Sequence, residues 1–167
     1  MKKIMLYSIV QCVLLVPAIA PAQLPGTAER PLSFSVVGMR GDSIRVPDPH
    51  GRLLLINLWA SWCASCATEL PALDSVATVL DTTRVMPVAL TEDASREAAQ
   101  TFLAHHTLGR YRVGFGDGRL KPALHYTGLP ETLLVTSDGR VVRRWLGYAG
   151  ADQLRDVQRA VRKQLGS

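Results

Sequence analysis

The sequence predicts a single α/β domain in which helices flank a central mixed β-sheet. A continuous apolar run at Leu53–Trp59 lies between turn-forming residues, which is typical of a strand buried on both faces. Short apolar segments alternate with segments of helical period, and the last of these, Ala151–Leu165, is amphipathic. The chain has 167 residues, of which 47% are apolar, and this is enough for one hydrophobic core.

The other elements are justified in order along the chain. Leu32–Val37 and Ser43–Val46 flank a turn at 38–42, which predicts an N-terminal β-hairpin before the buried strand. A helix is predicted at Ala64–Leu80, with a kink at Pro71. The remaining predictions are a strand at Arg84–Leu90, a helix at Ser95–His106 with Ala98, Phe102 and His105 on its inner face, a strand at Tyr111–Phe115, a short helix at Leu120–Tyr126, and two strands, Thr132–Thr136 and Val141–Leu146, around a turn at 137–139.

Residues 1–22 have the three parts of an export signal. Lys2 and Lys3 form the positive region, an apolar stretch follows, and Ala20-Pro21-Ala22 supplies small residues for cleavage before Gln23. The apolar stretch is short for a transmembrane helix, which needs about 20 residues. Cleavage is therefore predicted, with retention of this segment as a membrane anchor as the alternative.

After the leader, residues 23–31 form a predicted linker and residues 32–167 the globular domain. The linker is polar and contains Pro25, Gly26 and Pro31. The formal charge of +5 includes the two lysines of the leader, and the other basic residues form no long run. The composition therefore does not indicate a nucleic-acid partner. The predicted location is the periplasm or another exported compartment, with membrane attachment only if the leader is retained.

Two cysteines remain once Cys12 has left with the leader, and they form the motif Trp62-Cys63-Ala64-Ser65-Cys66. A lone pair three residues apart in an exported protein indicates redox chemistry. The motif opens a helix, where free N–H groups and the helix dipole favour a thiolate at Cys63. We expect an exposed Cys63 to attack a disulfide and a more buried Cys66 to resolve the mixed disulfide.

Two other uses of the cysteine pair fit the sequence less well. A structural zinc site needs four ligands, and His105 and His106 would point about 100° apart on a helix. A purely structural disulfide leaves the strand-to-helix position of the pair unexplained. We therefore predict no metal, and no cofactor apart from a redox-active Cys63–Cys66 disulfide.

These residues resemble the TlpA/ResA-like exported branch of the thioredoxin superfamily, over roughly residues 32–165. The matching features, in chain order, are Asn57–Trp62 at the end of the buried strand, the Cys-x-x-Cys pair, Glu69 and Pro71, and Gly128–Thr132 before a later strand. The resemblance implies a thioredoxin fold with an inserted βα element, and the activity of a thiol–disulfide oxidoreductase. The Ala64-Ser65 dipeptide departs from the family, which often has proline before the second cysteine.

The resemblance also implies a substrate-binding side of the site. Pro130 is expected in the cis form beside the sulfurs, and Leu129 is expected to present its backbone to the substrate. Trp59 and Trp62 are expected to form a platform near the cysteines, and Trp62 is taken as a substrate-binding residue. A cis X-Pro bond costs only about 0.5–1 kcal/mol, so the tight-turn context after Gly128 is compatible with it.

Two polar residues complete the site that the family implies. Glu69 is expected near the thiols as a catalytic residue, where it could accept a proton and raise a thiol pKa. The alternative is a solvated acid near the start of a helix, where the dipole favours it. Asn57 stands where thioredoxin has a buried aspartate, and we expect it to be a hydrogen-bonded core residue that does not titrate.

The expected function is the reduction of disulfides in exported client proteins. The resemblance implies re-reduction by a membrane thiol reductase of DsbD or CcdA type. Pro130-Glu131-Thr132 is similar to the cytochrome c maturation thioredoxins, which makes apocytochrome c a candidate client. Two alternatives stay open: a dithiol oxidase or isomerase, and a non-catalytic binding or chaperone module that uses the groove around Leu129 and Pro130.

Overall fold

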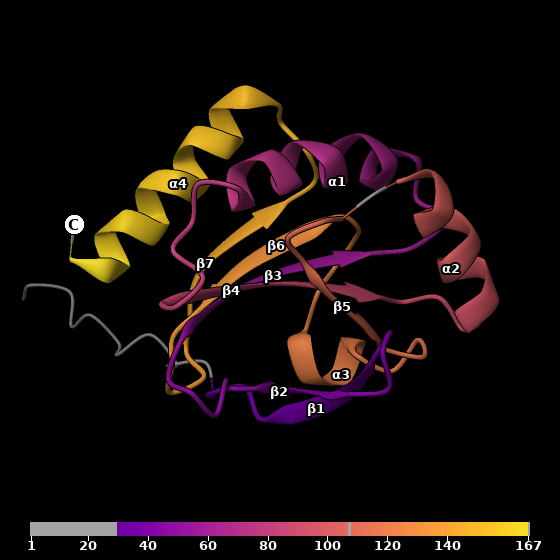
Figure 1. Cartoon of the computed structure of the whole chain (residues 1–167), viewed down its shortest axis with the longest axis horizontal. Coiled ribbons are helices and arrows are strands. Elements are labelled where there is room, and N and C mark those ends of the chain that lie inside the picture. The colour runs from indigo at the N-terminus through magenta and orange to yellow at the C-terminus, as the bar shows by residue number, and fades with distance from the viewer. Residues whose placement is uncertain (1–29, 107, 167) are drawn as a thin grey trace, which may run out of the picture.

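The computed structural model describes residues 30–106 and 108–166, which form a seven-stranded mixed sheet with helices on both faces (Figure 1). The predicted leader at 1–22 and most of the linker lie outside the described residues. The elements are β1 (Phe34–Gly38), β2 (Ser43–Val46), β3 (Leu53–Trp59), α1 (Ala64–Ala77), β4 (Val85–Thr91), α2 (Arg96–His105), β5 (Arg112–Phe115), α3 (Lys121–Leu124), β6 (Glu131–Val135), β7 (Val141–Leu146) and α4 (Ala151–Leu165).

The sheet has the strand order β2-β1-β5-β4-β3-β6-β7. β3 is parallel to β4 and antiparallel to β6, and β4 is parallel to β5. Every residue of β3 is buried, as its continuous apolar sequence predicted. Because β3 and β4 run in the same direction, the segments that follow them meet beyond the carboxyl ends of these strands, at one end of the sheet. α1, which starts with the cysteine motif, begins at this end of the sheet.

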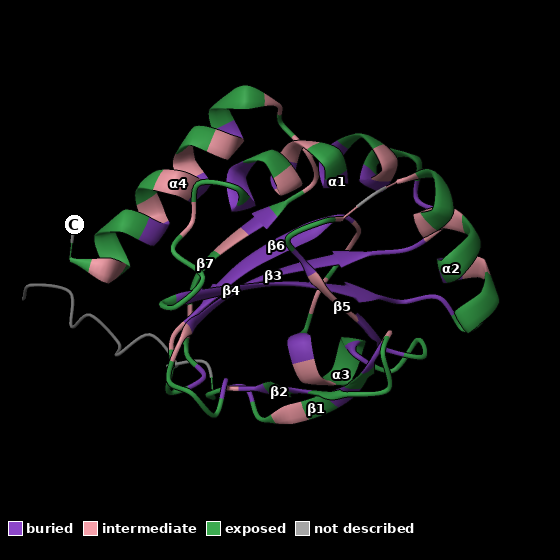
Figure 2. Cartoon of the chain, in the orientation of Figure 1, coloured by how far each residue is buried: buried purple, intermediate pink, exposed green. Residues whose placement is uncertain are grey.

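The sheet divides the hydrophobic core into two layers. Leu54, Ile56 and Leu58 of β3 point to the side that holds α3 and the β1–β2 hairpin. Leu55 points to the other side, where it packs with Val157 and other residues of α4. Figure 2 shows the resulting pattern, with buried residues concentrated in the central strands and exposed ones on the outer faces of the helices. Burying a leucine side chain stabilises the fold by roughly 1.5–3 kcal/mol.

The inner face of α2 differs from the prediction. Ala99 is its fully buried residue, Ala98 and Phe102 are half-buried, and His105 is exposed. The placement of His105 on the inner face was therefore wrong. His105 is the last residue of the helix, and it is the ring of the next residue, His106, that stacks on Phe102, with 4.2 Å between the ring centroids. α1 contains Pro71 on its exposed side and ends at Ala77, three residues before the predicted end.

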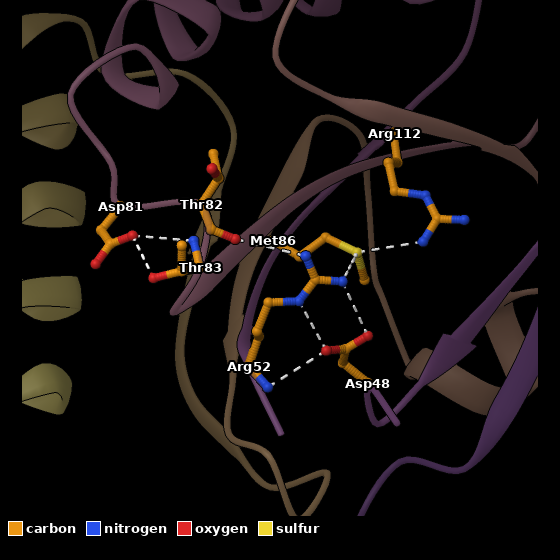
Figure 3. Close-up of polar contacts among 7 residues, drawn as sticks. All are labelled: Asp48, Arg52, Asp81, Thr82, Thr83, Met86 and Arg112. Carbon is orange, nitrogen blue, oxygen red and sulfur yellow. Dashed lines mark hydrogen bonds and ion pairs between the residues drawn. The ribbon is translucent and has the colours of Figure 1, made fainter. Parts of the chain in front are cut away.

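A polar cluster fixes the end of the sheet opposite to the cysteine motif (Figure 3). Arg52, just before β3, donates from Nε and Nη2 to the two oxygens of Asp48, at 2.9 and 3.2 Å. The same Nη2 lies 3.1 Å from Sδ of Met86 on β4, and Nη1 of Arg112 on β5 lies 3.5 Å from that sulfur. The start of β3 is thus tied to its neighbours by side chains as well as by backbone hydrogen bonds.

Gly139→Ala should destabilise the protein more than Gly41→Ala does. Both glycines have a positive φ, +87° and +80°, so both substitutions introduce backbone strain of about 1–2 kcal/mol. Only at Gly139 would the new Cβ meet backbone, at 2.5 Å from the carbonyl oxygen of Leu32. We expect the additional loss of unfolding free energy to be about 1–3 kcal/mol in urea titrations. Equal losses in the two variants would contradict this packing.

Candidate active site

The two cysteines lie at the first turn of α1 and are joined by a disulfide, with their Cα atoms 5.3 Å apart. Cys63 is the N-cap residue, and its Sγ accepts a hydrogen bond from the backbone N–H of Cys66 at 3.2 Å. The Cys63 residue is 7% exposed and Cys66 is fully buried. Cys63 is thus the more accessible of the two, but it is not the exposed residue that the sequence suggested. It lies in an apolar cluster with Trp59, and Leu129 packs against that cluster.

The loop before the disulfide is held by Asp93, which sequence reasoning did not identify. Its carboxylate accepts hydrogen bonds from the backbone N–H of Ser61 at 3.0 Å and from the Ser61 hydroxyl at 2.8 Å. Thr91, at the end of β4, donates to the same carboxylate at 2.6 Å. Asp93 therefore joins the end of β4 to the loop that leads into Cys63.

The two tryptophans of the motif lie in different environments. Trp62 is 70% exposed beside Cys63, whereas Trp59 is fully buried. The Trp59 ring packs on Phe102 of α2, with 4.9 Å between the ring centroids. They do not form the common platform that the resemblance implied, because Trp59 is the last residue of a strand that is buried throughout. Trp62 alone presents its ring to solvent at the site.

Glu69 lies one turn of α1 beyond Cys66 and is fully buried. Its carboxylate accepts hydrogen bonds from Nδ2 of Asn57 at 2.9 Å, from Nε2 of Gln153 at 3.2 Å and from the Thr132 hydroxyl at 3.4 Å. The alternative of a solvated acid is therefore wrong. Residues three apart on a helix are neighbours on one face, so Glu69 and Cys66, both fully buried, lie on the same face of α1.

Burial, opposed by three hydrogen bonds, determines how strongly Glu69 holds a proton. Burial raises the pKa of Glu69 from an ordinary value of 4.5 to about 7, although the hydrogen bonds from Asn57, Thr132 and Gln153 act to lower it. Asn57 is buried and hydrogen-bonded, in agreement with its predicted place in the core. Thr132 lay within the quoted motif without an assigned role, and no pattern in the sequence pointed to Gln153.

The Leu129–Pro130 peptide bond is cis, and the segment lies against the same apolar cluster as the cysteines. Pro130 is buried and Leu129 is half-buried. The carbonyl oxygen of Pro130 accepts a hydrogen bond from the N–H of Gly147 at 2.8 Å, which ties this segment to the loop after β7. A second cis bond, Val46–Pro47, follows β2 and was not predicted.

The predicted site residues thus gather at one end of the sheet. Cys63, Cys66 and Glu69 come from α1, and Leu129 and Pro130 come from the segment before β6. His105 and His106 lie at the C-terminal end of α2. Over the part of the chain that the structure describes, no group of three or more His, Cys, Asp or Glu side chains is placed to bind a metal ion.

Comparison with known proteins assigns the family. The sequence model of a family described as Thioredoxin-like matches residues 51–141, more than half of the chain. The chain belongs to the thioredoxin-like family. The ResA thiol–disulfide oxidoreductase of Bacillus cereus is 27% identical over 123 residues, which cover 73% of this chain and 70% of that protein. The thiol:disulfide interchange protein HelX of Rhodobacter capsulatus is 30% identical over 133 residues, covering 78% and 73%.

A solved structure agrees with these relatives. The crystal structure of a protein assigned as the thiol:disulfide interchange protein DsbE of Chlorobium tepidum has a TM-score of 0.69 and 25% identity, over 77% of this chain and 91% of that one. The predicted thioredoxin fold and the resemblance to the TlpA/ResA-like branch are confirmed. This member of the thioredoxin-like family is a thiol–disulfide oxidoreductase of ResA/DsbE type, and such enzymes act on disulfide-containing substrates.

Glu69→Gln should remove a pH dependence of stability. Because the folded state raises the pKa of Glu69 to about 7, the unfolding free energy is highest below the ordinary pKa and falls as the pH rises through 7. The expected contribution is about 3 kcal/mol. Urea unfolding of the oxidised protein between about pH 4 and 8 should show this loss. The matched control is Glu97→Gln at an exposed position of α2, which should keep the wild-type slope. Parallel curves for all three proteins would contradict the buried ionisation.

Proposed function

We propose that the protein is an exported reductant of protein disulfides and that Cys63 is its nucleophile. The observation that carries this proposal is the order of the two sulfurs, with a slightly accessible Cys63 at the helix N-terminus and a fully buried Cys66 behind it. The Cys66 N–H and the helix dipole stabilise negative charge on the Cys63 sulfur. The Ser65 hydroxyl, 3.6 Å from that sulfur, is placed to add a further hydrogen bond.

The reaction proceeds by two exchanges. The Cys63 thiolate attacks one sulfur of the client disulfide, so that a Cys63–client bond forms and the client S–S bond breaks, which releases a client thiolate. Cys66, as the thiolate, then attacks the Cys63 sulfur. The Cys63–Cys66 disulfide forms, the mixed disulfide breaks, and the second client sulfur leaves as a thiolate. Two electrons pass to the client, and two protons from solvent complete its thiols.

Glu69 acts as the proton acceptor for Cys66 in the second exchange. A carboxylate with a pKa of about 7 is matched to a base that works near neutral pH. Its position one turn from Cys66 places the two groups on the same face of α1. The ionised carboxylate disfavours a second negative charge close by, so it also raises the thiol pKa of Cys66.

The client lies across Trp62, Leu129 and Pro130. Trp62 offers an exposed ring, and the half-buried Leu129 offers backbone groups next to Cys63. Apocytochrome c is the client that the Pro130-Glu131-Thr132 segment favours, and a membrane thiol reductase of DsbD or CcdA type is the expected electron donor. Electrons pass only through the Cys63–Cys66 pair, so the reaction needs no other cofactor.

Cys66→Ser should trap a client that Cys63→Ser does not. Without the resolving sulfur, the first exchange stops at a mixed disulfide, which non-reducing electrophoresis and mass spectrometry detect. Wild-type protein should reduce the interchain disulfides of insulin, and Cys63→Ser should lose at least about 1000-fold in rate because the nucleophile is absent. Activity retained by Cys63→Ser would favour the binding or chaperone module.

The reduction potential should identify the direction of electron flow. Tryptophan fluorescence from Trp59 and Trp62 in a thiol–disulfide buffer series reports the redox state of the pair. A value near that of thioredoxin, about −270 mV, is expected for a reductant. A value near about −120 mV, as in the oxidant DsbA, would make the protein a disulfide donor and overturn the proposed direction.

Export should yield a mature protein that begins at Gln23. The positive, apolar and small-residue regions of residues 1–22 support a cleaved signal. Expression of the full chain in a Gram-negative host, followed by fractionation and N-terminal mass spectrometry, checks this. A chain with an intact leader in the membrane fraction would instead establish the anchored form, and a full-length chain in the cytoplasm would contradict export. The described residues contain no helix that qualifies as a candidate membrane span.

A further inference from the structure

Gln153 connects the buried carboxylate to a loop at the edge of the site. It is 7% exposed in the first turn of α4. One side of its amide group, Nε2, donates to Oε1 of Glu69 at 3.2 Å and to the carbonyl oxygen of Gly147 at 3.1 Å. The other side, Oε1, accepts from the N–H of Ala149 at 2.6 Å. A single side chain therefore holds both the carboxylate and the loop between β7 and α4.

That loop is joined in turn to the segment expected to bind the client. Gly147 donates its N–H to the carbonyl oxygen of Pro130 at 2.8 Å. The hydrogen bonds thus run continuously from Glu69 through Gln153 and Gly147 to Pro130. A hydrogen bond to an ionised carboxylate is roughly twice as strong as one to a neutral group. The first bond in this series therefore changes strength when Glu69 gains or loses a proton.

We propose that Gln153 is a positioning residue that couples the charge of Glu69 to the position of the loop at 147–150. The inference rests on the proposed role of Glu69 as the proton acceptor for Cys66. While Glu69 is ionised, the Gln153 amide is held firmly and keeps the loop against Pro130. When Glu69 takes the Cys66 proton, that hold weakens, and the loop loosens in the same step that releases the client.

Few other titratable groups face Glu69. Cys66 lies on the same helix, and Tyr111 lies just before β5. Burial raises the pKa of Tyr111 above its usual value, and the charge of Glu69 raises it further, so Tyr111 stays protonated. From β3, β6 and α4 the facing groups are Asn57, Thr132 and Gln153, which do not titrate. A titration of the loop near neutral pH would therefore report Glu69 when the disulfide is intact.

A purely structural role for Gln153 makes a different prediction. In that role Gln153 would do no more than cap the start of α4 with its Oε1. A glutamine at this position commonly accepts a hydrogen bond from a backbone N–H before the helix. The N-cap residue, Gly150, has no side chain that can make such a bond. That role uses the acceptor atom of the amide. The proposed coupling uses the donor atom, so one substitution can separate the two.

Gln153→Glu keeps an acceptor for Ala149 and replaces the donor to Glu69 with a second carboxylate. We expect the titration midpoint of Glu69, followed by NMR of carboxyl-¹³C-labelled glutamate in the oxidised protein, to rise by at least one pH unit, which is a tenfold change in proton affinity. Gln158→Glu, five residues further along α4 and on a different face of the helix, adds the same charge and should leave the midpoint unchanged. Gln153→Met, which removes both polar atoms, is the second test and should also raise the midpoint.

The loop itself supplies the second measurement. In the wild-type protein, the amide ¹H–¹⁵N signals of Gly147 and Ala149 should titrate with the midpoint of Glu69. They should lose that transition in Glu69→Gln, whose side chain has no charge to change. Unchanged loop titration in Glu69→Gln, or an unchanged Glu69 midpoint in both Gln153 variants, would overturn the proposal.

The proposed function is tested separately by the pH profile of insulin reduction. If wild type and Glu69→Gln share one profile, Glu69 is not the proton acceptor, and the proposed function loses that step. The NMR titrations would still decide whether Gln153 couples the carboxylate to the loop. If the loop titrates with Glu69 and the profile shifts in Gln153→Glu but not in Gln158→Glu, both the coupling and its use in the reaction are supported.

Discussion

The site depends on the complete burial of one carboxylate, that of Glu69, behind the cysteine pair. An isolated charge in such a place would cost several kcal/mol, so the fold must bring hydrogen-bond donors to it. They come from β3, β6 and α4, through Asn57, Thr132 and Gln153. Asn57 and Thr132 are register partners across β3 and β6, and their side chains therefore leave the sheet on the same face, toward α1. The carboxylate joins the helix that bears the cysteines to the sheet and to the last helix.

The same arrangement balances two opposing effects on the chemistry. Burial makes the charged form of Glu69 unfavourable, and the donors make it more favourable. The result is a pKa of about 7, close to neutral pH. If this carboxylate kept its ordinary pKa, it would be a weaker base. Without the hydrogen-bond donors its pKa would rise further, and it would stay protonated near neutral pH. A side chain that contributes to packing thereby also sets the acid–base properties of the site.

The sequence predicted the parts of the structure that depend on neighbouring residues. The buried strand β3, the cysteine motif at the start of α1 and the hairpin β1–β2 follow from local patterns, and the cis bond at Pro130 was expected from the resemblance. The parts that it missed depend on contacts between distant segments. Gln153 and Asp93 are polar residues within otherwise ordinary stretches, and only the folded chain brings them to Glu69 and to the loop before Cys63. The resemblance grouped Trp59 with Trp62 as a platform, although Trp59 is the last residue of a buried strand and Trp62 lies beyond its end.

The carboxylate also bears on whether the protein gives or takes electrons. A strong oxidant such as DsbA owes its potential to a stabilised thiolate in its reduced form. Here the helix N-terminus and the Cys66 N–H favour a thiolate on Cys63, which alone would make the pair more oxidising. An ionised Glu69 next to Cys66 acts in the opposite sense, because it disfavours further negative charge on the dithiol and so favours the disulfide. Within a buried site the second effect is little screened by water, and it increases with pH as Glu69 ionises. The position of Glu69 therefore supports the proposed role of the protein as a reductant.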